Sequence, residues 1–188
     1  ALLELMRSTQ RSERVAVAQR LLAAGRLCQM RMAAVEEIDR TQWCIDNWEA
    51  VAAEVGAELG ISRGRASSHM HTGRELLERL PRLAAVFAAG EVDYRIIAIA
   101  VFRTGLVIDD EVLRAVDATL ARLAPRWNAL SRDKVAELVD WRIRELDPMA
   151  VRVARQALTD RHVEIGPGRD GLAELWGSVR SPDAAALD

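Results

Sequence analysis

The chain has 188 residues, half of them apolar, and a formal net charge of -2. This length and composition are sufficient for one globular domain with an apolar core, and they argue against an intrinsically disordered chain. The near-neutral charge excludes a protein that coats nucleic acid with its whole surface, so any site for a polyanion has to be a local patch.

Helical periodicity dominates the chain up to residue 159. Apolar residues recur every three or four positions from about Ser12 to Ile38, and Gly25 leaves open whether this stretch is one long helix or two. The residues expected on its inner face are Val15, Ala18, Leu22, Leu27, Met30, Ala34 and Ile38. A helix capped by Ser131 is expected to end before Asp147. The remaining helices are expected, in chain order, at residues 47–59, 62–80, 82–89, 94–103, 110–123 and 149–159.

The period changes near the C-terminus. β-compatible runs flank the turn residues Gly166-Pro167-Gly168 and Asp170-Gly171, which predicts a hairpin. Its apolar side needs a cover, because a lone two-stranded hairpin is marginally stable in water. The fold class expected is therefore mostly α, a multi-helix domain that contains a helix-turn-helix-like corner, with a small β-hairpin near the C-terminus.

The corner between the second and third helices has the residue types of a helix-turn-helix. Leu59 is an apolar residue late in the first helix, and Gly60 can adopt the left-handed conformation that a corner requires. Ile61 is an apolar residue just after the corner, and Ser62 can cap the next helix. The geometry of a DNA-reading motif is therefore available.

The charge around this corner favours a polyanion. The sixteen residues from Leu59 to Arg74 include three arginines and two histidines but no acid. If Ala66 and Met70 face inward, the 100° step of a helix places Arg65 and Arg74 on the flanks. The side chains that then point outward are those of Gly64, Ser67, Ser68, His71, Thr72 and Glu75. The residues proposed to contact DNA are Arg63, Arg65, Ser67, Ser68, His71, Thr72 and Arg74. The same residues also fit a corner that only packs helices together, and both interpretations stay open.

Residues that could support catalysis or bind a metal are scattered. Cys28 and Cys44 are too far apart for a CxxC metal site or a disulfide framework, which fits a reducing cytoplasm. His69 and His71 project about 200° apart on a helix, a poor pair for one metal, so both are expected at the surface. Neither a GxSxG motif nor a phosphate-binding glycine loop occurs. We therefore expect no enzyme activity, no cofactor and no metal.

Two further expectations concern the apolar residues. No apolar run reaches about 18 residues, so no membrane association is expected and the localisation is expected to be cytoplasmic. The five tryptophans, spread over separate elements, are expected to fill the core or cover helix joints rather than form a base-stacking platform. The chain begins with Ala and ends at SPDAAALD, which suggests a fragment of a longer protein.

The stretch NWEAVAAEVGAELGISRGRASSHMHTGRELLERLPRLAAVFAAGEVDYRIIAIAV, with the later ELDP and the hairpin residues, resembles the 13E12-repeat family, an actinobacterial domain of unknown function (DUF 222). The resemblance covers roughly residues 12 to 180. Members usually carry a C-terminal HNH endonuclease domain and are associated with repeated or mobile elements. Three scattered histidines and two cysteines cannot build an HNH site. The resemblance therefore implies a single α-helical domain over residues 1–188, a non-catalytic fragment that lacks the HNH domain.

Three functions remain as hypotheses. The first is a DNA-binding module that brings an HNH nuclease to double-stranded DNA, and the second is a helical dimerisation or protein-interaction module, with a homodimer formed through the N-terminal helix. The third is a transcription regulator that uses the same corner. A positive surface centred on Arg63, Arg65 and Arg74 would favour DNA, whereas a large exposed apolar stripe on residues 15–38 would favour association.

Overall fold

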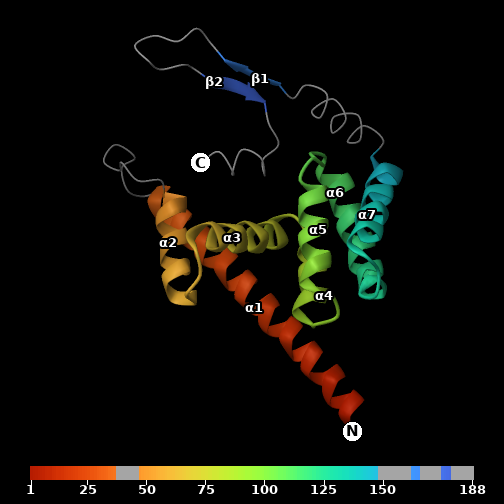
Figure 1. Cartoon of the computed structure of the whole chain (residues 1–188). Helices are drawn as coiled ribbons and strands as arrows, with labels where there is room; N and C mark the ends of the chain where they lie inside the picture. The colour runs from red at the N-terminus through yellow and green to blue at the C-terminus, as the bar shows by residue number, and fades with distance from the viewer. Residues whose placement is uncertain (37–46, 148–161, 166–174, 179–188) are drawn as a thin grey trace.

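A computed structural model describes residues 1–36, 47–147, 162–165 and 175–178 (Figure 1). Several sequence-based predictions fall outside these residues. They are the end of the first helix, Trp43 and Cys44, the helix at 149–159, and the turn residues at 166–171. These predictions are therefore not addressed by the structure.

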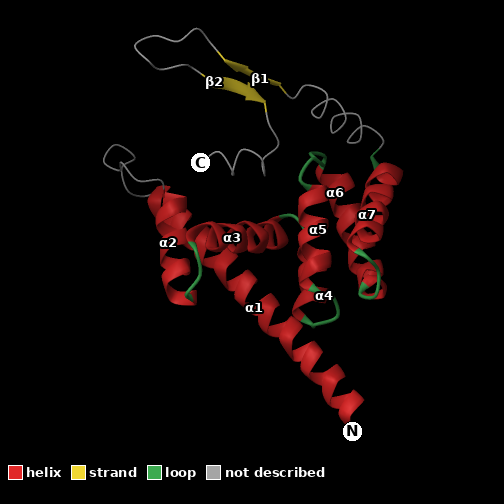
Figure 2. Cartoon of the chain, in the orientation of Figure 1, coloured by secondary structure: helices red, strands yellow, loops and turns green. Residues whose placement is uncertain are grey.

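The described part of the chain is mostly α, as the sequence predicts (Figure 2). Its helices, in chain order, are α1 (Leu2–Glu36), α2 (Asn47–Leu59), α3 (Arg63–Glu78), α4 (Pro81–Ala88), α5 (Tyr94–Thr104), α6 (Asp110–Leu123), the 3₁₀ helix η1 (Ala124–Trp127) and α7 (Arg132–Leu146). Two short strands follow, β1 (His162–Ile165) and β2 (Leu175–Ser178), which pair antiparallel with His162 opposite Ser178. The residues that would join them lie outside the described ranges, so the hairpin itself stays a prediction.

Local sequence signals explain where these helices begin. The side chains of Ser62, Asp93, Asp109 and Ser131 accept hydrogen bonds from amides in the first turns of α3, α5, α6 and α7. Pro81 occupies the first turn of α4, where its missing N–H costs nothing. The predicted starts of these helices are thus confirmed to within about two residues, a margin usual for helix ends.

The first helix begins earlier than predicted, at Leu2 rather than near Ser12. α1 continues through Gly25 without a break, which is one of the two possibilities that the sequence left open. Its buried stripe runs through Ala18, Leu21 and Cys28, whereas Met30, expected on the inner face, is 71% exposed. Toward the C-terminal end of α1, the inner side predicted from the apolar spacing therefore differs from the observed buried side by about one position.

Two apolar clusters lie toward the two ends of α3, and α1 contributes residues to both of them. One cluster joins Ala24 and Cys28 of α1 to α2 and to Ala66 and Met70 of α3. The other joins α1 and the end of α3 to α4, α5, α6 and α7, with Phe87 among its largest fully buried side chains. α3 therefore connects the corner with the rest of the molecule.

Buried polar groups hold the helices in register. Asp117 of α6, 2% exposed, accepts hydrogen bonds from the Arg82 and Leu83 amides, both at 2.9 Å, and so caps α4 from a different helix. Arg79 at the end of α3 donates to the Thr104 and Val107 carbonyl oxygens at 3.1 and 2.6 Å. These bonds tie α3 and α4 to the far side of the molecule.

The tryptophans only partly follow their prediction. Trp127 is buried, but Trp141 is 48% exposed, and the Arg142 guanidinium lies 4.1 Å from the centroid of its ring. A cation over an indole face is a favourable surface arrangement, so Trp141 does not fill the core as expected. None of the helices in the described residues is both long enough and apolar enough to cross a bilayer.

Candidate nucleic-acid interface

The corner between α2 and α3 has the local geometry that its sequence predicts. Gly60 has φ +62°, the left-handed conformation that favours glycine, and the Ile61 amide donates to the Gly56 carbonyl oxygen at 3.0 Å. Ser62 is extended, and its Oγ accepts a hydrogen bond from the Arg65 amide at 3.3 Å. Both the glycine turn and the serine cap of the prediction are confirmed.

The packing of α3 leaves one side of its first half in solvent. Ala66 and Met70 are fully buried toward α1 and α2. The exposed residues of this half, called here the α3 face, are Arg63, Gly64, Arg65, Ser68 and His71. Gly64, Ser68 and His71 lie opposite the buried side, with Arg63 and Arg65 at its two edges. The described structure therefore presents a five-residue surface without a carboxylate of its own.

Two of the predicted DNA-contacting arginines have acidic neighbours. Arg63 forms an ion pair with Glu49 of α2 at 3.0 Å, and Arg74 donates to both carboxylate oxygens of Glu78 at 2.9 and 3.0 Å. Partial burial disfavours ionisation of Glu78, but hydrogen bonds from Gln29 and Arg74 outweigh it and lower the pKa of this carboxyl. Arg74 is thus held along α3 by a charged partner.

The remaining arginine of the corner is less constrained. Arg65 is exposed, and within the described ranges it forms no ion pair shorter than 4.0 Å. Exposed ion pairs such as Arg63 with Glu49 contribute at most about 1 kcal/mol, so a phosphate can replace the glutamate as the partner of Arg63. Arg65 and Arg63 are therefore the two arginines best able to contact a polyanion.

Two polar residues of the predicted site serve the fold instead. Ser67 is half-buried, and its Oγ accepts a hydrogen bond from Trp48 Nε1 at 2.7 Å. Thr72 is 7% exposed, and its hydroxyl donates to the Ser68 carbonyl oxygen at 2.9 Å. The prediction that Thr72 faces outward is wrong, because Thr72 lies on the same side of α3 as His69 and Leu76, which are also buried.

The two histidines of α3 lie in different environments. His71 is exposed as expected, but His69 is only 7% exposed, and its buried Nδ1 has no hydrogen-bond partner among the residues that the structure describes. Burial lowers the pKa of His69, and the positive charges of Arg20 and Arg65 lower it further. The expectation of two surface histidines is therefore wrong for His69. Its spacing of three after Ala66 and four before Gly73 was the signal for an inward position.

The exposed end of α3 can do what helix N-termini generally do. Its first amides have no partner within the helix, and the helix dipole adds a partial positive charge there. Gly64 leaves the backbone open, since a Cβ at this position would meet no atom within 4 Å. Among the described residues, no three His, Cys, Asp or Glu side chains are grouped closely enough to hold a metal ion.

These features define the class of the protein. It is an α-helical bundle in which a corner with a glycine turn and a serine cap leads into a helix whose first turn is exposed and basic. Within this class, the chain belongs to the family described as a domain of unknown function (DUF222), whose model matches residues 8–188. The family resemblance found in the sequence is thereby confirmed. No solved structure matches the chain significantly.

Relatives occur in Mycobacterium tuberculosis. An uncharacterized protein in the est 3' region is 40% identical over 190 residues, which cover 100% of this chain and 53% of the relative. The uncharacterized proteins Rv3776 and Rv2100 of strain H37Rv are also 40% identical over 190 residues, with 100% of this chain and 36% and 34% of each relative covered. The chain thus spans about a third to about half of the length of these relatives.

Proposed function

We propose that this chain is a DNA-binding segment, non-catalytic by itself, which positions a longer protein on duplex DNA through the α2–α3 corner. The observation that carries the proposal is the α3 face: Gly64, Ser68 and His71 lie on the exposed side of a helix that is packed on its other side, and exposed Arg63 and Arg65 flank them. A DNA-reading helix needs this combination of rigid support and a free polar side.

The chemistry of the α3 face matches the two kinds of contact that such helices make. The major groove of DNA, about 12 Å wide, admits an α-helix. Arg63, Arg65 and the free amides of the first turn would bind phosphates and set the position of the helix. Ser68 and His71 lie one turn further along and would reach the base edges, while Gly64 allows the backbone to approach the duplex closely.

The length of the relatives fits a targeting role. Because the chain spans only about a third to half of each relative, other segments of the longer proteins are free to supply a second activity. The family resemblance suggests an HNH endonuclease domain as that activity, in a protein linked to repeated or mobile elements. On this proposal the helical segment selects or holds the DNA, and the nuclease would cut it.

A second candidate function is association through α1. Its N-terminal end extends past the helical body (Figure 1), and Leu2, Leu3, Leu5 and Met6 there are 58% to 77% exposed. An apolar cluster of this kind is typical of a protein contact, such as a homodimer. It lies before residue 15, however, outside the stripe on residues 15–38 that the association hypothesis requires.

A salt-dependent duplex titration of the full chain tests the proposal. Each arginine that binds a phosphate should contribute about one to the slope of log affinity against log salt. Arg63→Ala/Arg65→Ala should therefore weaken binding to all duplexes alike and reduce that slope by about two. Arg26→Ala/Arg132→Ala removes the same charge from exposed positions elsewhere and should bind DNA nearly as the parent does.

The same titration separates the two candidate functions. If Arg63→Ala/Arg65→Ala binds duplex DNA as tightly as the parent at low salt, the corner only packs helices, and the DNA-binding proposal fails. Sedimentation of the parent and of Leu2→Glu/Met6→Glu then tests association directly. A dimer that the glutamates dissociate would make association through α1 the function that remains.

A further inference from the structure

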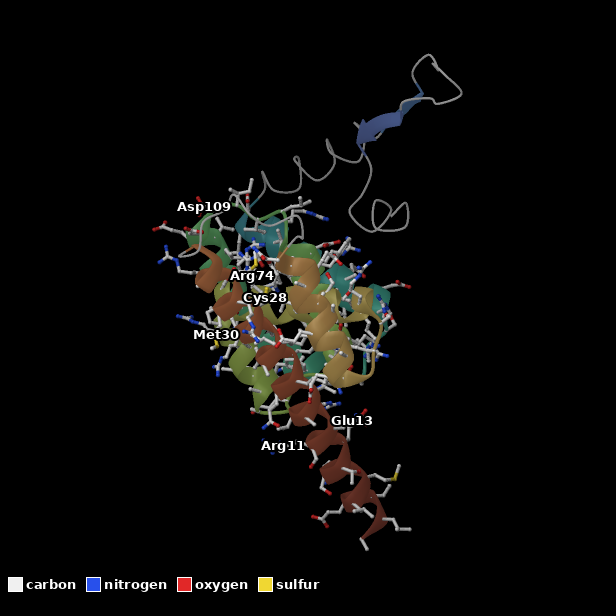
Figure 3. All side chains as sticks on the ribbon, turned by 90° about the vertical axis from the view of Figure 1, so that its left-hand side faces the viewer. Arg11, Glu13, Cys28, Met30, Arg74 and Asp109 are labelled. Carbon is white, nitrogen blue, oxygen red and sulfur yellow. The ribbon has the colours of Figure 1, made fainter. Side chains whose placement is uncertain are left out.

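A groove of about 560 Å³ lies between the N-terminal part of α1 and the turn that follows α4. Its α1 wall carries Arg7, Ser8, Arg11 and Arg14, and Gly90 and Pro125 lie on the opposite wall. In Figure 3, Arg11 and Glu13 project from different sides of α1, so the helix presents a distinct arginine-bearing side. The groove is separate from the α3 face.

Helical periodicity explains why arginines line this wall. The buried stripe of α1 runs through Ala18 and Leu21, and steps of three or four residues toward the N-terminus continue it to Arg14, Arg11 and Arg7. α1 extends past the apolar core (Figure 1), so this continuation of the stripe faces the groove instead of apolar neighbours. Three guanidinium groups therefore lie on the side of α1 that continues its buried stripe and faces the groove.

Most of the donors on these arginines are not used. Arg11 donates through Nε to the Ala89 carbonyl oxygen at 3.1 Å, which leaves its terminal N–H groups. Arg14 Nε is buried, and among the described residues its charged partner is Asp93, at 3.8 Å, too far for a hydrogen bond. Within the described residues Arg7 forms no ion pair. A buried guanidinium N–H without a hydrogen bond is costly unless a ligand accepts from it.

The opposite wall of the groove is rigid. Asn128 donates from Nδ2 to the carbonyl oxygens of Glu91 and Pro125, at 2.8 and 3.0 Å, and so joins the two segments that form this wall. Gly90 has φ +73°, and a Cβ there would lie 2.8 Å from Val15 Cγ2. The turn is thus held against α1, and the groove exists before any ligand binds.

We propose that this groove binds a small molecule that carries a phosphate group, with Arg7, Arg11 and Arg14 as its anion-binding residues. Guanidinium groups match phosphate oxygens in geometry and keep their charge at any physiological pH. Glu4 and Glu91 also line the groove, but they are exposed, so solvent weakens their repulsion of an anion.

The shape of the site favours a small ligand over nucleic acid. A concave site of this volume lies in the usual range for small-molecule pockets, about 300 to 1,000 Å³. Duplex DNA is itself convex toward a protein and is gripped by protruding elements such as the α3 face. The groove therefore adds a ligand site to the chain and does not depend on the proposed DNA contact.

Calorimetric titration of the full chain tests this proposal, with inorganic pyrophosphate and, separately, ATP without metal as the probes. We expect at least one of them to bind, and to bind more weakly as the salt concentration rises. Arg7→Gln/Arg11→Gln should weaken that binding at least about tenfold, because two charge-assisted contacts are lost. Arg26→Gln/Arg132→Gln removes the same charge from two exposed positions that do not line the groove, and this variant should bind the probe as the parent does.

A second variant keeps all three arginines and so tests the groove even if the first variant fails to fold. Ser8→Glu puts a negative charge on the α1 wall at an exposed position, leaves the bond from Arg11 to Ala89 in place, and should also abolish binding. Binding of pyrophosphate alone would assign the site to a phosphate group, and binding of ATP alone to a nucleotide. Failure of both probes to bind, or binding unchanged in both groove variants, overturns the proposal.

The outcomes also separate this groove from the α3 face. Arg63→Ala/Arg65→Ala should leave binding of the phosphate probe unchanged, and Arg7→Gln/Arg11→Gln should leave the affinity for duplex DNA nearly unchanged. If instead Arg7→Gln/Arg11→Gln lowers duplex affinity and neither small probe binds, the groove is a second DNA contact and the small-ligand proposal is wrong.

Discussion

Gly25 of α1 and Gly73 of α3 lie against each other where the two helices cross. A Cβ on Gly25 would lie 2.8 Å from Gly73 Cα, and a Cβ on Gly73 would lie 2.9 Å from the Gly25 amide nitrogen. Any side chain at either position would meet backbone, which cannot turn aside as a flexible side chain can. The close crossing brings Leu21 and Leu76 into one core, and it holds α3 in place behind the α3 face.

We predict that Gly73→Ala destabilises the protein although alanine is the better helix former. In an exposed helix this change would stabilise by about 1 kcal/mol. Here the added methyl group forces α1 and α3 apart, and overpacking of this kind costs about 1 to 3 kcal/mol or more. Urea unfolding followed by circular dichroism would measure the loss.

Gly64 supplies the matched control on the same helix. A Cβ at this position meets no atom within 4 Å, so Gly64→Ala should raise the free energy of unfolding by up to about 1 kcal/mol. If Gly73→Ala and Gly64→Ala prove equally stabilising, the two helices do not cross as closely as the structure has them.

Asp117 should be among the residues whose loss is most costly. Its two carboxylate oxygens accept from the Arg82 and Leu83 amides in a buried setting. Asp117→Ala leaves both donors unpaired, and we expect a loss of roughly 2 to 4 kcal/mol in the free energy of unfolding. Asp109→Ala removes an exposed cap of α6 and should cost only about 1 kcal/mol. Equal losses in the two variants would contradict the role of Asp117 as a buried cap.

The stability of the protein should depend on the protonation of His69. Burial and the charges of Arg20 and Arg65 lower its pKa in the folded state, so the unfolded chain binds a proton more readily. The stability contributed by neutral His69 is therefore complete above the unfolded pKa of about 6.5 and is lost as the pH falls toward the folded value. Unfolding midpoints measured between neutral and mildly acidic pH would follow this loss.

Variants at the two neighbouring histidines isolate the effect. His69→Gln removes the titrating group and should flatten the acid side of the stability profile. His71→Gln changes an exposed position and keeps His69, so it should retain the parent's loss of stability in acid. A profile for His69→Gln that matches the parent would assign the pH dependence to other groups.

The sequence predicted where the helices begin better than it predicted which side of each helix is buried. Helix starts followed from short-range signals, such as Ser62 and Ser131, whose side chains cap their own helices. The inward position of Thr72 depends on how α3 packs against helices far away in the sequence, and no local pattern encodes that packing. Met30 illustrates the same limit, because only the path of α2 and α3 decides which side of α1 is covered.

Packing between helices also explains why the candidate site in the structure differs from the site predicted from the sequence. Ser68 and His71 are exposed because they lie opposite the packed side of α3, and Arg65 is exposed on its flank, as the helical wheel predicts. Ser67 is not part of the α3 face because its Oγ accepts a hydrogen bond from the indole N–H of Trp48, nineteen positions earlier. A side-chain hydrogen bond between two helices depends on their relative orientation, which the corner sequence does not specify.

These differences lead to a prediction about which polar residues of α3 read DNA. Ser67→Ala should cost about 1 to 3 kcal/mol of stability, because a partly buried indole N–H loses its acceptor, and it should leave any base preference unchanged. Ser68→Ala and His71→Ala should leave the fold stable, and each should alter preference at one base position by about 1 kcal/mol or more if the duplex is read there. Melting curves and competition binding on a set of duplexes with single base-pair changes would measure both effects. A base preference that responds to Ser67→Ala, but to neither Ser68→Ala nor His71→Ala, would contradict the proposed α3 face.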